Sequence, residues 1–237
     1  MRRLSRYALL YDWLVGVYTS AAVDQSSDLG ARLRQSRETA GLGLRELARR
    51  LELSASALSQ IETGKSRPSV KTLYAIVSEL GLSLDELFEN HAGDRSGADV
   101  GAASAGPPAA VQRAEERASL ELDSGVSWER LTAAHDSEVD FLFTTYEPGG
   151  ASSSTDKLVR HSGREYGIVL SGELEVTVGF ETHSLERGDS ISFDSQEPHR
   201  LANRGKEPVT AIWFVIGRRQ SDPRRPSFNS DANQFGN

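Results

Sequence analysis

Apolar residues recur with a helical period in the first part of the chain and with a strand period in its second half. Between Leu29 and Phe88, spacings of three and four residues predict five short helices joined by tight turns. Leu44, Leu47 and Leu51 form the clearest apolar stripe, and the opposite face of that helix is charged. From about Ser119 the apolar period falls to two, which predicts strands. The chain therefore divides into a helical part and a sheet part.

Capping residues mark the ends of the expected helices. Ser54 is placed to cap the second helix of a tight pair, because its hydroxyl can accept from a backbone N–H two or three residues on. Gly64 ends that helix, since glycine most easily takes the left-handed conformation past a helix C-terminus. Ser69 and Gly81 bracket the following helix. A complete small helical domain is expected.

The second helix of the tight pair has an outer face that suits entry into the major groove of DNA. Leu58 and Ile61 face the first helix of the pair. The outward positions hold Ala55, Ser56, Ser59 and Gln60. Small side chains let a helix approach the base edges, and Gln60 can pair bidentately with adenine N6 and N7. This pattern favours a DNA-binding helix-turn-helix over a simple helical bundle.

Over roughly 29–88 the sequence resembles, residue by residue, the phage-repressor-like helix-turn-helix proteins, also called the XRE family. The resemblance implies that Ala55, Ser56 and Gln60 lie at base-reading positions, with Ser59 beside them. It places Lys65 at a phosphate-contacting position in the loop that follows. The expected partner is double-stranded DNA.

The same resemblance implies one structural ion pair and one departure. Arg37 and Glu62 occupy positions that form a partly buried pair in several family members, tying the first helix to the recognition helix. The family usually opens its second helix with a Ser or Thr cap followed by a Gln that touches phosphate. Gly43 and Leu44 stand there instead, so this chain departs from the family at one phosphate anchor.

Composition limits the classes of function. The 237 residues are 38% hydrophobic and 26% charged, which is typical of one or two globular domains. The absence of cysteine excludes disulfides and thiolate metal sites. The formal net charge of −7 belongs to the C-terminal half, because residues 28–93 carry nine basic and nine acidic side chains. A neutral helical domain predicts a DNA binder with few phosphate contacts.

Changes in composition divide the chain into five regions. They are an N-terminal extension at 1–27, the helix-turn-helix domain at 28–90, a flexible linker at 91–117, a sheet domain at 118–218 and a disordered tail at 219–237. The linker has almost no large apolar residue, so burial cannot offset its ordering entropy. The extension mimics a secretory signal, but Asp12 interrupts an apolar run too short to span a bilayer. We expect a cytoplasmic protein without a membrane segment.

The sheet domain is predicted to be a sandwich or barrel of short strands. Alternating runs occur at 139–143, 167–169, 174–178 and 191–193. Turn signals separate them at 149–150, 171–172, 187–188 and 203–205. No helical pattern lies between the runs, so a parallel nucleotide-binding sheet is not expected.

Two segments of this domain, HSGREYGIVLSGELEV and LERGDSISFDSQEPHRLAN, resemble the two motifs of the cupins, the double-stranded β-helix barrels. Cupins commonly hold a divalent metal with three His and one Glu. At the matching positions this chain keeps His161, Glu165 and His199, whereas Val159 replaces the first of the paired histidines and Ser153 replaces the opening Gly. The resemblance thus implies at most a three-ligand site.

Two interpretations of this trio stay open. Two imidazoles and one carboxylate are chemically sufficient for Zn, Ni or Fe. A polar trio in a barrel mouth serves equally well to orient an organic ligand. His183, at an outward-looking strand position, is expected on the surface, and no catalytic residue is expected.

The expected fold class is α+β multidomain, with an N-terminal all-α five-helix helix-turn-helix domain and a C-terminal all-β double-stranded β-helix (cupin) barrel. This domain order resembles a class of prokaryotic transcription factors. The resemblance implies a homodimer whose barrel senses a small-molecule effector or metal while the helical heads bind an operator. The alternative is a mononuclear non-haem iron oxidase or epoxidase, because the hydroxypropylphosphonate epoxidase shares the domain order and the His-x-x-x-Glu spacing. An antitoxin that binds a partner protein is a third reading.

Overall fold

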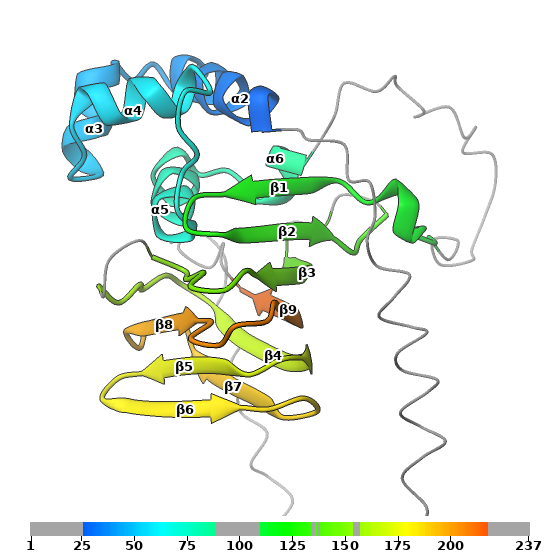
Figure 1. Cartoon of the computed structure of the whole chain (residues 1–237). Helices are drawn as coiled ribbons and strands as arrows, with labels where there is room; N and C mark the ends of the chain where they lie inside the picture. Colours follow the sequence, from blue (N-terminus) through cyan, green and yellow to red (C-terminus); the bar gives the residue numbers. More distant parts are fainter. Residues whose placement is uncertain (1–25, 89–109, 134–135, 137, 154–156, 218–237) are drawn as a thin grey trace, which may run out of the picture.

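The computed structural model shows a helical domain lying on one end of a β-barrel (Figure 1). It describes residues 26–88, 110–133, 136, 138–153 and 157–217. The extension at 1–25, most of the expected linker and the tail from 218 lie outside the described residues. No helix in the described part of the chain is long and apolar enough to cross a membrane.

The helical domain contains the five expected helices. They are α2 (Ser26–Thr39), α3 (Leu44–Arg50), α4 (Ala55–Glu62), α5 (Val70–Leu80) and α6 (Asp85–Phe88). Leu33, Leu58, Leu73 and Phe88 are almost completely buried in its core. The first helix begins at Ser26, three residues earlier than its apolar pattern indicated, because the apolar period shows only the residues that face the core.

Three serine caps fix the helix starts, and two of them, Ser54 and Ser69, were predicted from the sequence. The hydroxyl of Ser54 accepts from the backbone N–H of Ala57 at 3.0 Å. Ser69 and Ser83 make the corresponding bonds to the third residue after each, both at 3.2 Å. Gly43 precedes α3 without a side-chain cap, which confirms the departure from the family at this position.

The barrel domain consists of two antiparallel sheets. Its strands are β1 (Ser119–Leu122), β2 (Val126–Arg130), β3 (Val139–Tyr146), β4 (Arg164–Ser171), β5 (Leu174–Val178), β6 (Glu181–Leu185), β7 (Ser190–Asp194), β8 (His199–Ala202) and β9 (Val209–Ile216). The larger sheet has the order β1-β2-β3-β9-β4-β7, and the smaller has the order β6-β5-β8. A short 3₁₀ helix, η1 (Ala114–Glu116), precedes β1 within the range expected for the linker. The two sheets confirm the all-β second half.

One close approach inside the larger sheet positions a functional side chain. Gly167 on β4 pairs with Trp213 on β9, and the indole ring lies over the glycine. A Cβ atom at Gly167 would lie 2.0 Å from the ring, so only glycine leaves room for it. The indole is thereby directed toward Glu165, which precedes Gly167 by two residues on the same face of β4.

The helical domain is docked on the barrel through α5 and the β1–β2 hairpin. The backbone N–H of Lys71 donates to the carbonyl of Ser152 at 3.1 Å, and that of Asp123 donates to the carbonyl of Pro68 at 2.9 Å. The Tyr74 ring of α5 lies 5.3 Å from the Trp128 ring of β2, centroid to centroid. The two domains therefore share an interface in addition to their covalent connection.

Candidate nucleic-acid interface and candidate metal centre

Helix α4 presents the residues that the sequence placed at base-reading positions. Ser56 and Gln60 are exposed, Ala55 and Ser59 are partly buried, and Lys65 is exposed in the loop that follows. The backbone N–H of Lys65 donates to the carbonyl of Gln60 at 2.8 Å, so this loop is held against the helix end. Ser56 and Gln60 therefore lie on the outer face of α4, and their contact with DNA stays a prediction.

Arg37 and Glu62 form the ion pair that the family resemblance implied. Arg37 Nε lies 2.7 Å from one Glu62 carboxylate oxygen, and Nη2 lies 2.9 Å from the other. Both residues are buried, and Arg37 Nη1 also donates to the carbonyl of Leu42 at 2.8 Å. This two-pronged contact locks α4 to α2, so the recognition helix has a fixed direction.

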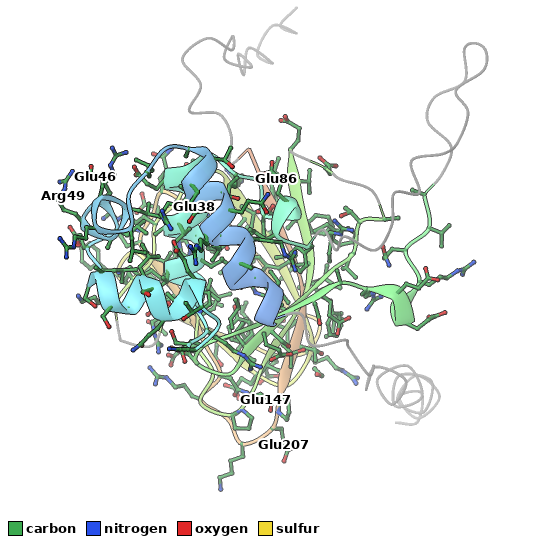
Figure 2. All side chains as sticks on the ribbon, turned by 90° about the horizontal axis from the view of Figure 1, so that it is seen from above. Glu38, Glu46, Arg49, Glu86, Glu147 and Glu207 are labelled. Carbon is green, nitrogen blue, oxygen red and sulfur yellow. The ribbon has the colours of Figure 1, made fainter. Side chains whose placement is uncertain are left out.

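Two of the three arginines of α3, Arg49 and Arg50, are engaged by nearby carboxylates. Glu46 accepts from Arg49 and Arg50 at 2.8 Å each, and Arg50 also bonds Glu79 at 2.8 Å. Hydrogen bonds from Arg49 and Arg50 lower the pKa of Glu46 to about 2. Figure 2 shows Glu46 and Arg49 at the outer edge of the helical domain. These contacts neutralise part of the basic charge of α3, and the low phosphate count stays a prediction.

The three ligand candidates of the barrel converge inside it. Glu165 Oε1 lies 3.0 Å from His161 Nε2 and 3.1 Å from His199 Nε2. His161 precedes β4, Glu165 lies on β4, and His199 begins β8 of the other sheet. The side chains of all three are at most 5% exposed. Among the described residues, this is the one His and carboxylate group with atoms close enough to share a metal ion.

The hydrogen bonds of the two imidazoles show which ring nitrogens face the carboxylate. Each Nδ1 faces a backbone carbonyl, His161 that of Ser162 at 3.1 Å and His199 that of Glu197 at 2.9 Å. A carbonyl accepts only, so each Nδ1 carries the proton and each Nε2 of a neutral ring presents a lone pair. Both lone pairs face the same carboxylate oxygen. When both rings are neutral, three acceptors meet at one point and a divalent metal can join them; when a ring is protonated, its Nε2–H donates to the carboxylate instead.

Glu165 and His199 have pKa values that suit metal ligation at neutral pH. Burial alone would raise the pKa of Glu165, but contact with His161 and the charges of both histidines outweigh it, so the pKa lies below its usual range. Burial lowers the pKa of His199. The second Glu165 oxygen accepts from Trp213 Nε1 at 2.7 Å, which holds the carboxylate in place. The site is thus an oriented carboxylate between two imidazoles.

Apolar and aromatic residues complete the walls of the site. Val159 is buried and pairs with His199 in a β-bridge, so an apolar side chain stands where cupins place a fourth ligand. Trp213 and Trp128 line the cavity from the large sheet. Tyr74 comes from the helical domain, and its ring centroid lies 4.5 Å from that of His161. No sequence pattern indicated Tyr74, because its role depends on how the two domains dock.

Two families match this chain. The family described as helix-turn-helix domain matches residues 28–89, and the family described as cupin domain matches residues 142–215. The HTH-type transcriptional regulator PuuR of Escherichia coli is 28% identical over 180 residues, which cover 76% of this chain and 90% of that relative. The chain combines an XRE-type helix-turn-helix domain with a C-terminal cupin domain. The HTH-type transcriptional regulator DdrOP3 of Deinococcus deserti is 36% identical over 58 residues, covering 24% of this chain and 45% of that relative.

A solved structure has the same two-domain fold. The HTH_3 family transcriptional regulator of Vibrio cholerae matches with a TM-score of 0.57 and 23% identity, covering 81% of this chain and 96% of that chain. The match to PuuR likewise extends over most of both proteins. The regulatory interpretation is therefore confirmed, and the alternative of an iron oxidase is the weaker one. The protein is a DNA-binding transcriptional regulator rather than an enzyme.

Proposed function

We propose that the protein acts in the cytoplasm as a homodimeric regulator whose operator binding responds to a divalent metal held by His161, Glu165 and His199. The observation that carries this proposal is that two imidazole Nε2 atoms lie 3.0 and 3.1 Å from one carboxylate oxygen. That geometry lies in a chain whose other domain is a DNA reader. A bound metal would supply positive charge at this point, and the trio would fix its place in the barrel.

Zn, Ni and Fe are the metals that this donor set favours, because imidazole nitrogen suits all three. The test is metal analysis of the natively purified protein, followed by Co²⁺ titration of wild type and Glu165→Gln. We expect one metal per chain in wild type and weaker binding in the variant. Wild-type protein that takes up no metal would reject the proposed metal site.

Base reading is assigned to the outer face of α4, with Gln60 as the main specificity residue and Lys65 as a phosphate contact. Gln60 is exposed, and its amide can address adenine N6 and N7, whereas Lys65 carries only a point charge. Selected-site enrichment with the full-length protein should give a preferred operator. Gln60→Ala should change the preferred base at one position of each half-site, whereas Lys65→Ala should leave the preference unchanged.

Dimerisation is assigned to the outer face of the larger sheet. Phe141, Phe214 and Tyr166 form one row across β3, β9 and β4, and the first two rings stack at 4.2 Å between centroids. Tyr166 is 41% exposed and Ile168 beside it is 40% exposed, so an apolar surface faces outward. A second copy can cover it around a two-fold axis, which presents two α4 helices to half-sites about one helical turn apart, or a multiple of that.

Sedimentation of the full-length protein tests this face. The double variant Tyr166→Lys/Ile168→Lys should sediment as a monomer at micromolar concentration and lose operator affinity. Phe180→Lys is the matched control, because Phe180 is a fully exposed aromatic residue on the β5–β6 hairpin, away from the row. A double variant that stays dimeric would place the interface elsewhere.

A further inference from the structure

Helix α5 is buried on two sides, and only one of them belongs to the helical domain. Leu73, Ile76 and Val77 are fully buried. Val70 and Tyr74, one turn apart, are 5% and 6% exposed and line the cavity of the barrel site. The second side of α5 is therefore part of the wall around the metal-ligating trio.

Tyr74 of α5 lies against the trio. Its ring stands between two barrel rings, 4.5 Å from His161 and 5.3 Å from Trp128 by centroids. The neighbouring Lys71 is bonded through its backbone N–H to the carbonyl of Ser152. Ser152 in turn exchanges two bonds with Leu201, which follows His199 by two residues on β8. The docking contact and the ligand strand are thus directly linked.

The space left under α5 is very small. The cavity lined by the trio, Val70, Tyr74 and the barrel residues has a volume of about 20 Å³. That volume is room for about one water molecule. A metal ion with its three protein ligands fits, but an organic metabolite does not. Any larger molecule needs a displacement of the residues that close the cavity.

We propose that α5 of the DNA-binding domain is the lid of the barrel site. Ligands larger than a water molecule reach His161 and His199 only when Tyr74 and the helical domain leave the barrel mouth. Organic effectors that bind the metal ion are the ligand class for which this lid matters. This inference rests on the proposed function for the identity of the site, but the closure itself can be tested without metal.

The lid gives a direct route from effector to DNA. Helices α4 and α5 belong to one core, joined by Ile61, Leu73 and their neighbours, so displacing α5 moves the recognition helix with it. A ligand that binds only the open state shifts the population of docked heads by its differential affinity. By linkage, any change that weakens docking must raise the affinity for such a ligand by the same factor.

Carbethoxylation of histidine in the metal-free, full-length protein measures the opening of the lid. Diethyl pyrocarbonate attacks an unprotonated imidazole nitrogen and is much larger than water. Peptide mass spectrometry gives separate rates for His161, His199 and His183. His183 lies on β6 with a side chain 46% exposed, so it is an internal standard in every variant. We expect His161 and His199 in wild type to react at least about tenfold more slowly than His183, since an open minor state is typically populated at 0.1–10%.

Two sets of variants separate the lid from other causes of protection. Tyr74→Ala should raise the rates of His161 and His199 at least tenfold without changing His183, whereas Tyr74→Phe, which keeps the ring, should behave as wild type. The double variant Lys71→Cys/Ser152→Cys provides a disulfide staple that holds the docked state. The chain has no other cysteine, and the backbone N of residue 71 lies 3.1 Å from the backbone O of residue 152. The oxidised staple should lower the carbethoxylation rates of His161 and His199, and reduction should restore the wild-type rates.

Equal His161 and His199 rates in wild type and Tyr74→Ala would overturn the proposal, as would a staple without effect on them. Co²⁺ titration of the same wild-type sample keeps this result distinct from the proposed function. A wild type that binds Co²⁺ but whose histidine reaction rates do not depend on Tyr74 would support the metal site and reject the lid. Lid-dependent reactivity without metal binding would uphold the lid and reject the metal.

Discussion

Replacing Glu62 by alanine should destabilise the helical domain strongly, because it leaves the guanidinium of Arg37 buried without its main partner. Arg37 is 8% exposed and Glu62 is 7% exposed, and two bonds of 2.7 and 2.9 Å join them. Breaking a buried pair from one side costs about 3–5 kcal/mol of unfolding free energy. We expect the lower end, since Glu38 still lies 3.5 Å from Arg37 and its bond to the Leu42 carbonyl remains.

A loss of that size matches the stability that a core this small usually supplies, about 3–5 kcal/mol. Urea unfolding checks it with two signals. Circular dichroism at 222 nm reports the helices, and the fluorescence of Trp128 and Trp213 reports the barrel in a Trp13→Phe background. Glu62→Ala should move the helical transition to much lower urea, while the barrel transition moves less.

The double variant Arg37→Met/Glu62→Leu provides the control for a buried charge. It removes both ions and fills their space with apolar groups, so most of the lost stability should return. Glu46→Ala breaks the exposed contacts with Arg49 and Arg50 and should scarcely change the helical midpoint. A Glu62→Ala variant as stable as Glu46→Ala, or a double variant no better than the single one, would refute the argument.

Three further predictions concern the barrel site. Gly167→Ala should cost at least about 1–3 kcal/mol of barrel stability, measured by fluorescence-detected urea unfolding, because its Cβ would lie 2.0 Å from the Trp213 ring. Trp213→Phe should weaken Co²⁺ binding about 10- to 100-fold in a folded barrel, since it removes the donor to Glu165; calorimetry checks this. The metal-free barrel should lose stability as the pH falls below about 6.5, because burial holds the pKa of His199 below that unfolded value and the unfolded chain binds more protons. His199→Gln should flatten this dependence in urea melts at pH 7.5 and 5.5.

The helical domain could be predicted almost entirely from the sequence, because its determinants are local. The Ser54 cap and the Leu58 and Ile61 spacing involve residues within one or two turns of each other. The start of α2 could not be placed, since Ser26 and Ser27 carry no apolar signal. The Arg37–Glu62 pair was predicted only from the family resemblance, because no local sequence pattern links residues 25 positions apart.

The barrel site could be predicted in its ligands but not in its surroundings. His161, Glu165 and His199 stand in motifs, whereas Trp213 reaches Glu165 across a strand pairing that no spacing reveals. No sequence pattern indicated Tyr74, because it is buried by contact with Trp128, which lies 54 residues away in the sequence. Both residues depend on long-range packing, which is the part of a structure that single-sequence patterns describe least.

Operator titration by fluorescence anisotropy is the most direct test of the barrel trio as a sensing site. Wild type and Glu165→Ala are each titrated metal-free and metal-saturated. The metal is the one that co-purifies, or Zn²⁺ when none does. Metal should shift the operator affinity of wild type by about 5- to 150-fold, the usual range of coupling between two sites. Glu165→Ala should bind operator as metal-free wild type does and show no shift, because no residue of α4 is changed. Identical metal responses in the two proteins would contradict the assignment of His161, Glu165 and His199 as the sensing site.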